Sequence, residues 1–200
     1  LRIPVSELMP YNALLIPITY LFYKKNFQPL SEREEILFEQ YFWWASLTNR
    51  FSSAVESKIE QDLHRMDDIL DGKLPSYRGE EIQIKLEDLL DRWFSAGDAF
   101  CKAILCLYAY QQPKRFNNNG LVKIDNSWLK QSNSKNYHHF FPNAYLRNKG
   151  YAYWQSNVIL NITIVDDYLN KRKIKARAPK DYLAEFAPKN KHFNETIQSH

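Results

Sequence analysis

The stretch NYHHFFP, residues 136–142, places two histidines side by side and a proline three positions after the second. Its aromatic run, closed by Pro142, predicts a short β-strand. His138 and His139 are two of only five histidines in the chain. The pair is therefore either a site for chemistry or a structural pair, with one imidazole capping a turn and the other exposed.

A second strand and a helix are expected downstream of the histidine pair. Residues 158–165, VILNITIV, are rich in β-branched side chains, which is typical of a strand. Residues 166–175, DDYLNKRKIK, begin with acidic and end with basic side chains, the polarity that a helix dipole favours. An Asn-Asn-Asn-Gly turn predicts one more strand at Leu121–Asp125, and residues 178–186 predict a short helix.

The first half of the chain is predicted to be helical. Ser31 and Glu34 stand at capping-box spacing before an apolar stripe. Ser53 and Glu56 repeat that spacing, and Gly72 is expected to end the second helix. The predicted apolar stripe of this second helix is Val55, Ile59, Leu63, Met66 and Leu70.

Two more helices are predicted within residues 82–94 and 96–112, and the helical pattern stops at Pro113. We therefore expect a mainly α (α+β) fold with two domains. These are a helical bundle at residues 1–112 and a small β-β-α unit at residues 113–200, which the resemblance described below would make a β-β-α-metal unit. A chain of 200 residues that is 44% hydrophobic can bury a core in each.

The composition favours a soluble protein of a reducing compartment. Cys101 and Cys106 lack the spacing of a zinc knuckle, and we expect them to be small core residues. The most apolar run, residues 12–23, is too short to cross a membrane, and we recognise no signal peptide. We therefore expect a cytoplasmic protein without a membrane partner. The start at Leu1, without a Met, indicates a piece of a longer protein.

Charge is divided unevenly along the chain. Residues 1–100 carry 11 Lys and Arg against 17 Asp and Glu, whereas residues 101–200 carry 16 against 6. A basic half joined to an acidic half indicates that one part meets a polyanion and the other does not. The alternative is an ordinary basic domain without a nucleic-acid role.

A β-β-α unit would bring Asn170, on its helix, toward His138 and His139 at the strand end. Hydrolysis of a phosphodiester needs a base for water and a cation for the phosphorane and the departing oxygen. Two imidazoles and an amide are candidates for the base and for metal ligands. The Lys and Arg side chains after Asn170 are candidates for holding the flanking phosphates.

These residues resemble the HNH, or His-Me finger, nuclease motif in the C-terminal region of GmrSD-type restriction endonucleases. The resemblance rests on the His-x-x-Pro motif from His139 to Pro142 and on the asparagines that follow it, Asn157, Asn161 and Asn170. The interval between the last two asparagines is also similar to that in the HNH domain of CRISPR effector nucleases. Two helical segments, LMPYNALLIPITYLFYKK and RFSSAVESKIEQDL, resemble the family's segments before the motif, so the resemblance covers most of the chain.

The resemblance implies a role for each matched residue. His139 would be the general base, and Asn161 would complete the catalytic set by bracing the loop through hydrogen bonds. His138 and Asn170 would be the metal ligands, although many HNH enzymes have Asp where His138 stands. The implied cofactor is Mg²⁺ or Mn²⁺, with Ni²⁺ or Zn²⁺ possible because imidazole is a softer ligand than carboxylate. The implied nucleic-acid contacts are Lys171, Arg172, Lys173, Lys175 and Arg177.

The function that follows from the resemblance is metal-dependent DNA endonuclease activity of a restriction or phage-defence type. The partners would be DNA and a ParB-like N-terminal domain that this chain lacks. The alternative is a catalytically inactive HNH-like module that binds nucleic acid or docks a partner. A purely structural helical domain is the third hypothesis.

Overall fold

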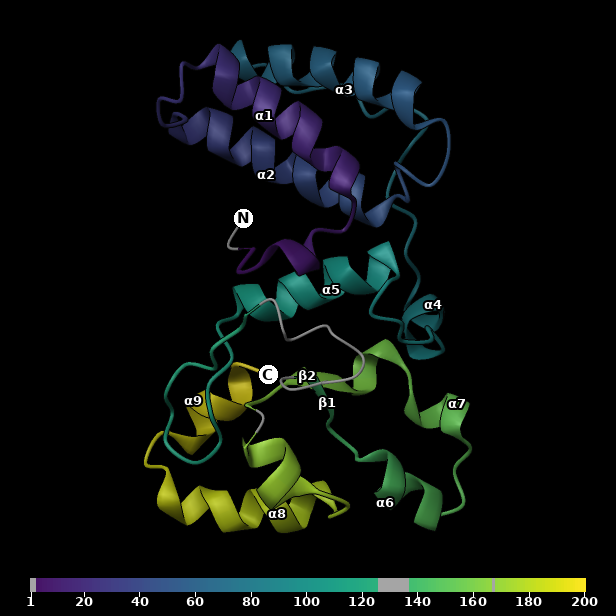
Figure 1. Ribbon diagram of the computed structural model, residues 1–200, viewed down its shortest axis with the longest axis vertical. Coiled ribbons are helices and arrows are strands. Elements are labelled where there is room, and N and C mark those ends of the chain that lie inside the picture. Colours follow the sequence, from purple (N-terminus) through teal and green to yellow (C-terminus); the bar gives the residue numbers. More distant parts are fainter. Residues whose placement is uncertain (1–2, 126–136, 167) are drawn as a thin grey trace. The chain divides into compact units, whose positions relative to one another are not determined.

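The computed structural model describes residues 3–125, 137–166 and 168–200. The chain forms two compact units (Figure 1). The first unit is Met9–Gln83. The second is Ile84–His200 together with the described residues before Met9.

The first unit is a helical bundle, as predicted. Its helices are α1 (Leu15–Lys24), α2 (Glu32–Leu47) and α3 (Val55–Leu70), and the short 3₁₀ helix η2 (Asn12–Leu14) precedes α1. Helix α3 packs on both α1 and α2 (Figure 1). None of the helices in the described part of the chain is both long and apolar enough to cross a lipid bilayer.

The predicted capping box at the start of α2 is confirmed. The Glu34 N–H donates to Ser31 Oγ at 3.4 Å, and the Ser31 N–H donates to the Glu34 carboxylate at 2.6 Å. Gly72 also ends the second long helix as predicted. It has a φ of +70°, which favours glycine, and its N–H donates to the Ile69 carbonyl at 2.9 Å.

The predicted start and buried face of α3 are partly wrong. The residue that precedes the helix is Ala54, with a φ of 49° and no side-chain cap, so Ser53 does not cap it. The side chains that α3 buries are Asp62, Met66 and Ile69. Hydrophobic periodicity could not predict this face because its centre is a carboxylate.

Asp62 is the centre of a buried ion-pair network in the first unit. Its side chain is fully buried and accepts hydrogen bonds from the Tyr41 hydroxyl at 2.8 Å and from Arg50 Nη2 at 3.0 Å. Arg65 also pairs with it. Both guanidinium groups lie over the Trp44 ring, at 5.2 and 4.6 Å from its centroid. The network joins α2, α3 and the loop between them.

The second unit contains a small sheet surrounded by short helices. Two strands, β1 (Tyr137–His139) and β2 (Ile162–Ile164), pair antiparallel with His138 opposite Thr163 and His139 opposite Ile162. Figure 1 shows this pair between α5 and the segment that includes α8. Its helices are η1 (Ser6–Leu8), α4 (Leu86–Leu90), α5 (Ala99–Tyr110), α6 (Asn143–Asn148), α7 (Tyr153–Ser156), η4 (Ile159–Asn161), the π-helix η5 (Leu169–Ile174), α8 (Pro179–Phe186), η6 (Ala187–Lys189) and α9 (Phe193–Gln198).

The order β1, β2, η5 matches the predicted sequence of strand, strand and helix. The core on which these elements pack consists of Phe116, Val165, Leu169, Ile174, Tyr182 and Phe186. The Tyr182 hydroxyl donates to the Phe140 carbonyl at 2.7 Å, which ties α8 to the residue just after β1. The fold is therefore mainly helical with one small sheet.

Three predicted features of this region differ from the structure. Residues 121–125 form no strand; Leu121 makes only an isolated bridge with Lys114. The helix predicted within residues 82–94 covers only Leu86–Leu90. The first half of VILNITIV turns as the 3₁₀ helix η4, which leaves a shorter strand.

The two compact units also divide after Gln83, whereas the predicted domain boundary lies at residue 112. Helix α5 has the periodicity of the bundle helices, but it packs on β2 and η1. A helical pattern shows which face is buried and not which unit buries it.

Candidate functional site

His139 lies at the end of β1 and is held by one asparagine. Its Nε2 atom is 3.0 Å from Asn157 Oδ1. Asn157 is buried, and its amide is fixed from the other side because Nδ2 donates to the Phe94 carbonyl at 3.0 Å. The Phe94 N–H donates back to the Asn157 carbonyl at 2.9 Å. His139 therefore contacts a side chain that cannot turn without breaking this pairing.

The fixed amide determines the tautomer of His139. Because Asn157 uses its only donor group on Phe94, it presents an acceptor oxygen to the imidazole. Nε2 of His139 must then carry the proton, and Nδ1 keeps its lone pair. Burial lowers the pKa of His139, and the hydrogen bond to Asn157 offsets part of that effect. The imidazole is therefore neutral at pH 7 and can accept a proton at Nδ1.

Asn161 holds the turn that follows β1. Its Oδ1 accepts from the Phe141 N–H at 2.8 Å, and its Nδ2 donates to the carbonyls of Phe141 at 3.0 Å and Ser156 at 2.8 Å. The Asn161 carbonyl also accepts from the Phe140 N–H at 2.7 Å. This side chain thus ties the end of β1 to the residue before Asn157. Bracing of this kind is what the resemblance implies for Asn161.

We expect Asn161→Ala to lower the free energy of unfolding by about 2–4 kcal/mol. The substitution leaves the three backbone groups that contact the amide without their partner, and the contact with the Ser156 carbonyl is buried while the two with Phe141 are partly buried. Urea denaturation followed by circular dichroism measures the change. Asn194→Ala, at an exposed position of α9, is the matched control and should change stability by less than about 0.5 kcal/mol. Equal effects of the two substitutions would contradict the bracing role.

His138 lies on the other face of the two-stranded pair. Successive side chains of a strand point to opposite faces, so His138 leaves β1 beside Thr163 and away from His139. Its Nε2 is buried and has no hydrogen-bond partner among the described residues. Burial, together with the neighbouring His139, lowers the pKa of His138 to about 3. His138 is therefore a neutral imidazole with an unpaired buried nitrogen.

The same face carries a third histidine that the sequence did not single out. His200 Nε2 lies 2.7 Å from the Lys114 carbonyl, so this nitrogen carries the proton and donates it. His200 Nδ1 then accepts from the Thr163 hydroxyl at 2.8 Å. Burial lowers the pKa of His200. Both ring nitrogens have structural partners, so we assign this side chain a packing role.

The predicted metal ligands His138 and Asn170 lie on different elements, β1 and η5. Asn170 is half-buried in η5, and the structure gives no hydrogen bond between its side chain and either histidine within the described ranges. Among the described residues, no three His, Cys, Asp or Glu side chains lie close enough together to bind a metal ion. The unpaired Nε2 of His138 is a suitable metal ligand, but the neighbouring His139 points to the opposite face of the strand pair.

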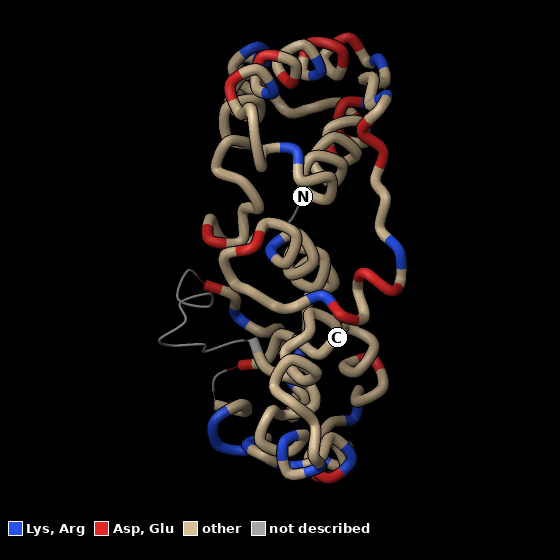
Figure 2. The backbone as a smooth tube through the Cα atoms, turned by 90° about the vertical axis from the view of Figure 1, so that its right-hand side faces the viewer, with Lys and Arg blue, Asp and Glu red and all other residues tan. Residues whose placement is uncertain are grey.

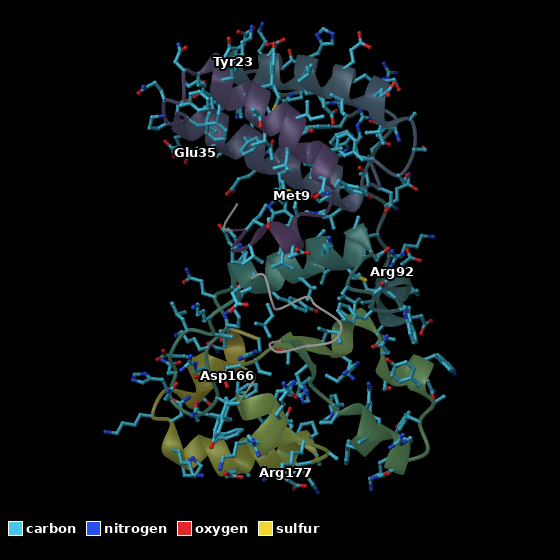
Figure 3. The ribbon with its side chains drawn as sticks, in the orientation of Figure 1. Met9, Tyr23, Glu35, Arg92, Asp166 and Arg177 are labelled. Atoms are coloured by element: carbon cyan, nitrogen blue, oxygen red, sulfur yellow. The ribbon has the colours of Figure 1, made fainter. Side chains whose placement is uncertain are left out.

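The helix that carries Asn170 begins at a capping carboxylate. Asp166 Oδ1 accepts from the Leu169 N–H at 2.9 Å, and the same carboxylate lies 3.6 Å from Arg115 Nε (Figure 3). This contact explains why the acidic start of DDYLNKRKIK favours a helix there.

The five predicted nucleic-acid contacts differ in their surroundings. Figure 2 shows Lys and Arg gathered at the lower end of the second unit, where Figure 1 draws α8. Lys171, Arg172 and Lys175 are exposed, and Lys173 is half-buried. Arg177 (Figure 3) instead pairs with Glu185 at 2.7 Å.

Arg177 also donates to two carbonyls, those of Lys173 at 3.2 Å and Asp181 at 2.9 Å. These contacts hold the turn between η5 and α8. Arg177 therefore fixes the backbone that presents the neighbouring cations, a role that the sequence did not indicate.

Asn157 is the residue of the candidate site to which the sequence assigned no role. It stands between His-x-x-Pro and Asn161 and was a recognisable part of the motif, but its partner is remote in sequence. The segment Arg92–Phe94 pairs with residues 157–159 through an isolated bridge between Trp93 and Val158 and through the Ile159 N–H, which donates to the Arg92 carbonyl at 2.8 Å. No local pattern marks this pairing.

Comparisons with known proteins give one distant relative to report. An uncharacterized protein of Methanocaldococcus jannaschii is 26% identical over 199 residues, which covers 96% of this chain and 32% of that protein. The chain thus spans about a third of the length of the curated relative that it matches. No family model and no solved structure matches the chain.

Proposed function

We propose that this chain is the nuclease-bearing part of a metal-dependent DNA endonuclease. The observation that carries the proposal is the fixed tautomer of His139, whose Nε2–H is held by Asn157 while Nδ1 keeps a lone pair. A neutral imidazole, oriented by a second group, is the arrangement that a general base for water needs. In the proposed reaction, His139 Nδ1 takes a proton from the water that attacks the phosphorus. The P–O bond to the departing oxygen of the strand breaks, and this oxygen takes a proton from solvent water.

The neighbouring residues support this role through positioning and charge. Asn161 holds the turn after His139, so the imidazole is attached to a rigid backbone. The exposed cations Lys171, Arg172 and Lys175 follow on η5 and at its end. Positively charged side chains of this kind bind phosphates without reading sequence. We therefore assign them, with Lys173, to the flanking phosphates of the DNA strand.

A divalent cation belongs to the proposal, as Mg²⁺ or Mn²⁺ with Ni²⁺ or Zn²⁺ as alternatives. Such an ion would stabilise charge on the phosphate during cleavage. His138 and Asn170 are the side chains proposed to contribute to its binding. The described residues do not fit a complete site made by protein alone, and Mg²⁺ commonly takes few protein ligands together with substrate phosphates. No step of the proposed reaction is therefore assigned to the ion.

The wider biological role rests on the resemblance of the motif. We propose a restriction or defence endonuclease of the GmrSD type that acts in the cytoplasm together with a ParB-like N-terminal domain. The greater length of the archaeal relative is consistent with additional domains.

The direct test is nicking of supercoiled plasmid DNA by the purified chain. We expect conversion to the open-circular form with Mn²⁺ or Mg²⁺ and none after addition of EDTA, because the proposed reaction requires a divalent cation. Gel electrophoresis measures the conversion. Intact plasmid under every metal would refute the endonuclease proposal, and nicking that persists in EDTA would refute the metal requirement.

A catalytically inactive nucleic-acid-binding module is the second candidate. It is favoured by the opposite orientations of His138 and His139 and by the incomplete ligand set of the described residues. This candidate predicts DNA binding that weakens steeply with salt, without cleavage under any metal.

A further inference from the structure

A pocket that the proposed reaction does not use lies between α6 and α7 in the second unit. Its volume is about 370 Å³, at the small end of the range for ligand pockets. Its lining consists of Asn143, Ala144, Arg147, Tyr151, Tyr153 and Ser156. The volume suits one planar ring system and is too small for a folded segment of a partner.

The pocket has aromatic walls. Tyr151 and Tyr153 are 51% and 59% exposed, although both side chains line a concave surface. The Tyr153 ring packs edge-on against Trp93, with the ring centroids 5.3 Å apart and the planes at 80°. This contact fixes the Tyr153 ring before any ligand arrives. Exposed aromatic rings in a pocket of this size favour a flat, aromatic ligand.

Two polar side chains add chemical selectivity. Asn143 Oδ1 is buried and has no hydrogen-bond partner among the described residues, so it can accept a hydrogen bond from a ligand. Arg147 supplies a positive charge at the same pocket. A planar ring that carries an amino or imino donor and is joined to a negative group can donate to Asn143 and pair with Arg147. A nucleobase with its phosphate has this combination.

The pocket is connected directly to the candidate active site. Asn143 follows Pro142, the last residue of the His-x-x-Pro motif, and Ser156 precedes Asn157. Asn161, which holds the turn after His139, donates to the Ser156 carbonyl at 2.8 Å. One lining residue of the pocket, Asn143, is therefore adjacent in sequence to the end of the His-x-x-Pro motif. Another, Ser156, is adjacent to Asn157, which contacts His139.

We propose that this pocket binds an unstacked nucleobase of the DNA strand whose phosphate reaches His139. The inference deepens the proposed endonuclease function and rests on it for the identity of the strand. The base stacks on the tyrosine rings, Asn143 accepts a hydrogen bond from its edge, and Arg147 meets the adjoining phosphate. Base-paired DNA keeps its bases stacked, so the pocket favours single-stranded or locally opened substrate.

The test is the binding of a short single-stranded oligonucleotide that carries one 2-aminopurine, measured in EDTA so that no cleavage is needed. We expect the fluorescence of the analogue to change on binding. We also expect Tyr151→Ala to raise the Kd roughly 5- to 150-fold, the range for loss of one base–aromatic stack. Tyr23→Ala, at a similarly exposed tyrosine of the first unit, is the matched control and should leave the Kd unchanged.

The outcomes separate this inference from the nuclease proposal. Tyr151-dependent binding without plasmid nicking would uphold the pocket and refute the endonuclease. Nicking with equal oligonucleotide affinity in the wild type and in Tyr151→Ala would refute the pocket alone. Equal affinity for the oligonucleotide and for one with an abasic position in place of 2-aminopurine would also refute it. Tyr151→Phe should bind like the wild type, because it keeps the ring.

Discussion

His139→Ala is expected to slow plasmid nicking by roughly 10²- to 10⁴-fold, the usual contribution of a positioned general base. The substitution removes the imidazole whose Nδ1 keeps a lone pair because Asn157 Oδ1 holds the proton on Nε2. Initial rates of open-circle formation measure the effect. His64→Ala, at an exposed histidine of α3, is the control and should nick at the wild-type rate. Wild-type nicking by His139→Ala would remove the imidazole from the mechanism.

His139→Gln distinguishes chemistry from structure. A glutamine amide can donate to Asn157 Oδ1 in place of the imidazole Nε2, but it is not a base at neutral pH. We therefore expect this variant to be as slow as His139→Ala while melting at the wild-type temperature. If His139→Gln restored the rate, the imidazole would be structural.

The pH dependence of nicking belongs to the same prediction. A general base must be neutral, so the wild-type rate rises with pH and levels off above the pKa of His139. Burial lowers that pKa, so the midpoint of the rising limb lies below about pH 6.5, the value for an unperturbed histidine. The rising limb should be absent from the residual activity of His139→Ala.

Asp62→Ala is expected to destabilise the first unit by about 3–5 kcal/mol, the usual effect of removing one partner from a buried ion pair. Arg50 is almost fully buried, and it loses the carboxylate that lies 3.0 Å from its Nη2, so that Glu80 is left as its ion-pair partner. The Tyr41 hydroxyl loses its acceptor as well. Urea denaturation followed by the fluorescence of Trp44, whose ring contacts both arginines, reports the change.

Glu60→Ala is the matched control for Asp62→Ala. Glu60 is an exposed acidic residue on the same helix, so its removal should change stability by less than about 0.5 kcal/mol. A loss below about 1 kcal/mol for Asp62→Ala would show that the network contributes little. Asp62→Asn should be intermediate, because the amide keeps one acceptor for Tyr41 but loses one of the two carboxylates, Asp62 and Glu80, that pair with Arg50.

Local sequence signals predicted the local structure well. The capping box at Ser31 and the stop at Gly72 follow from backbone chemistry within a few residues, and both are confirmed. The strand around His138 and the helix after Asp166 also follow from patterns of that kind. The buried Asp62 was missed because its partners Tyr41 and Arg50 come from other segments.

The candidate site shows the same limit. The sequence pointed to His139 and Asn161, and the structure gives both of them contacts that can position a reacting group. It assigned no role to Asn157, whose contact with His139 depends on Phe94, 63 residues earlier. The prediction that His138 and His139 face the same point was also based on their adjacency in sequence, whereas neighbouring side chains of a strand point to opposite faces.

The pairing between Phe94 and Asn157 limits how this protein can be divided or recombined. A fragment that begins at residue 113, where the helical pattern ends, would contain every residue of the His-x-x-Pro motif and its asparagines. It would nevertheless lack the carbonyl that fixes the Asn157 amide. Freed of that contact, the amide could rotate and present its NH₂ group to His139, which would move the imidazole proton to the other nitrogen. A fragment that keeps the candidate site intact is therefore longer than the motif, and it must include the segment Arg92–Phe94 before α5.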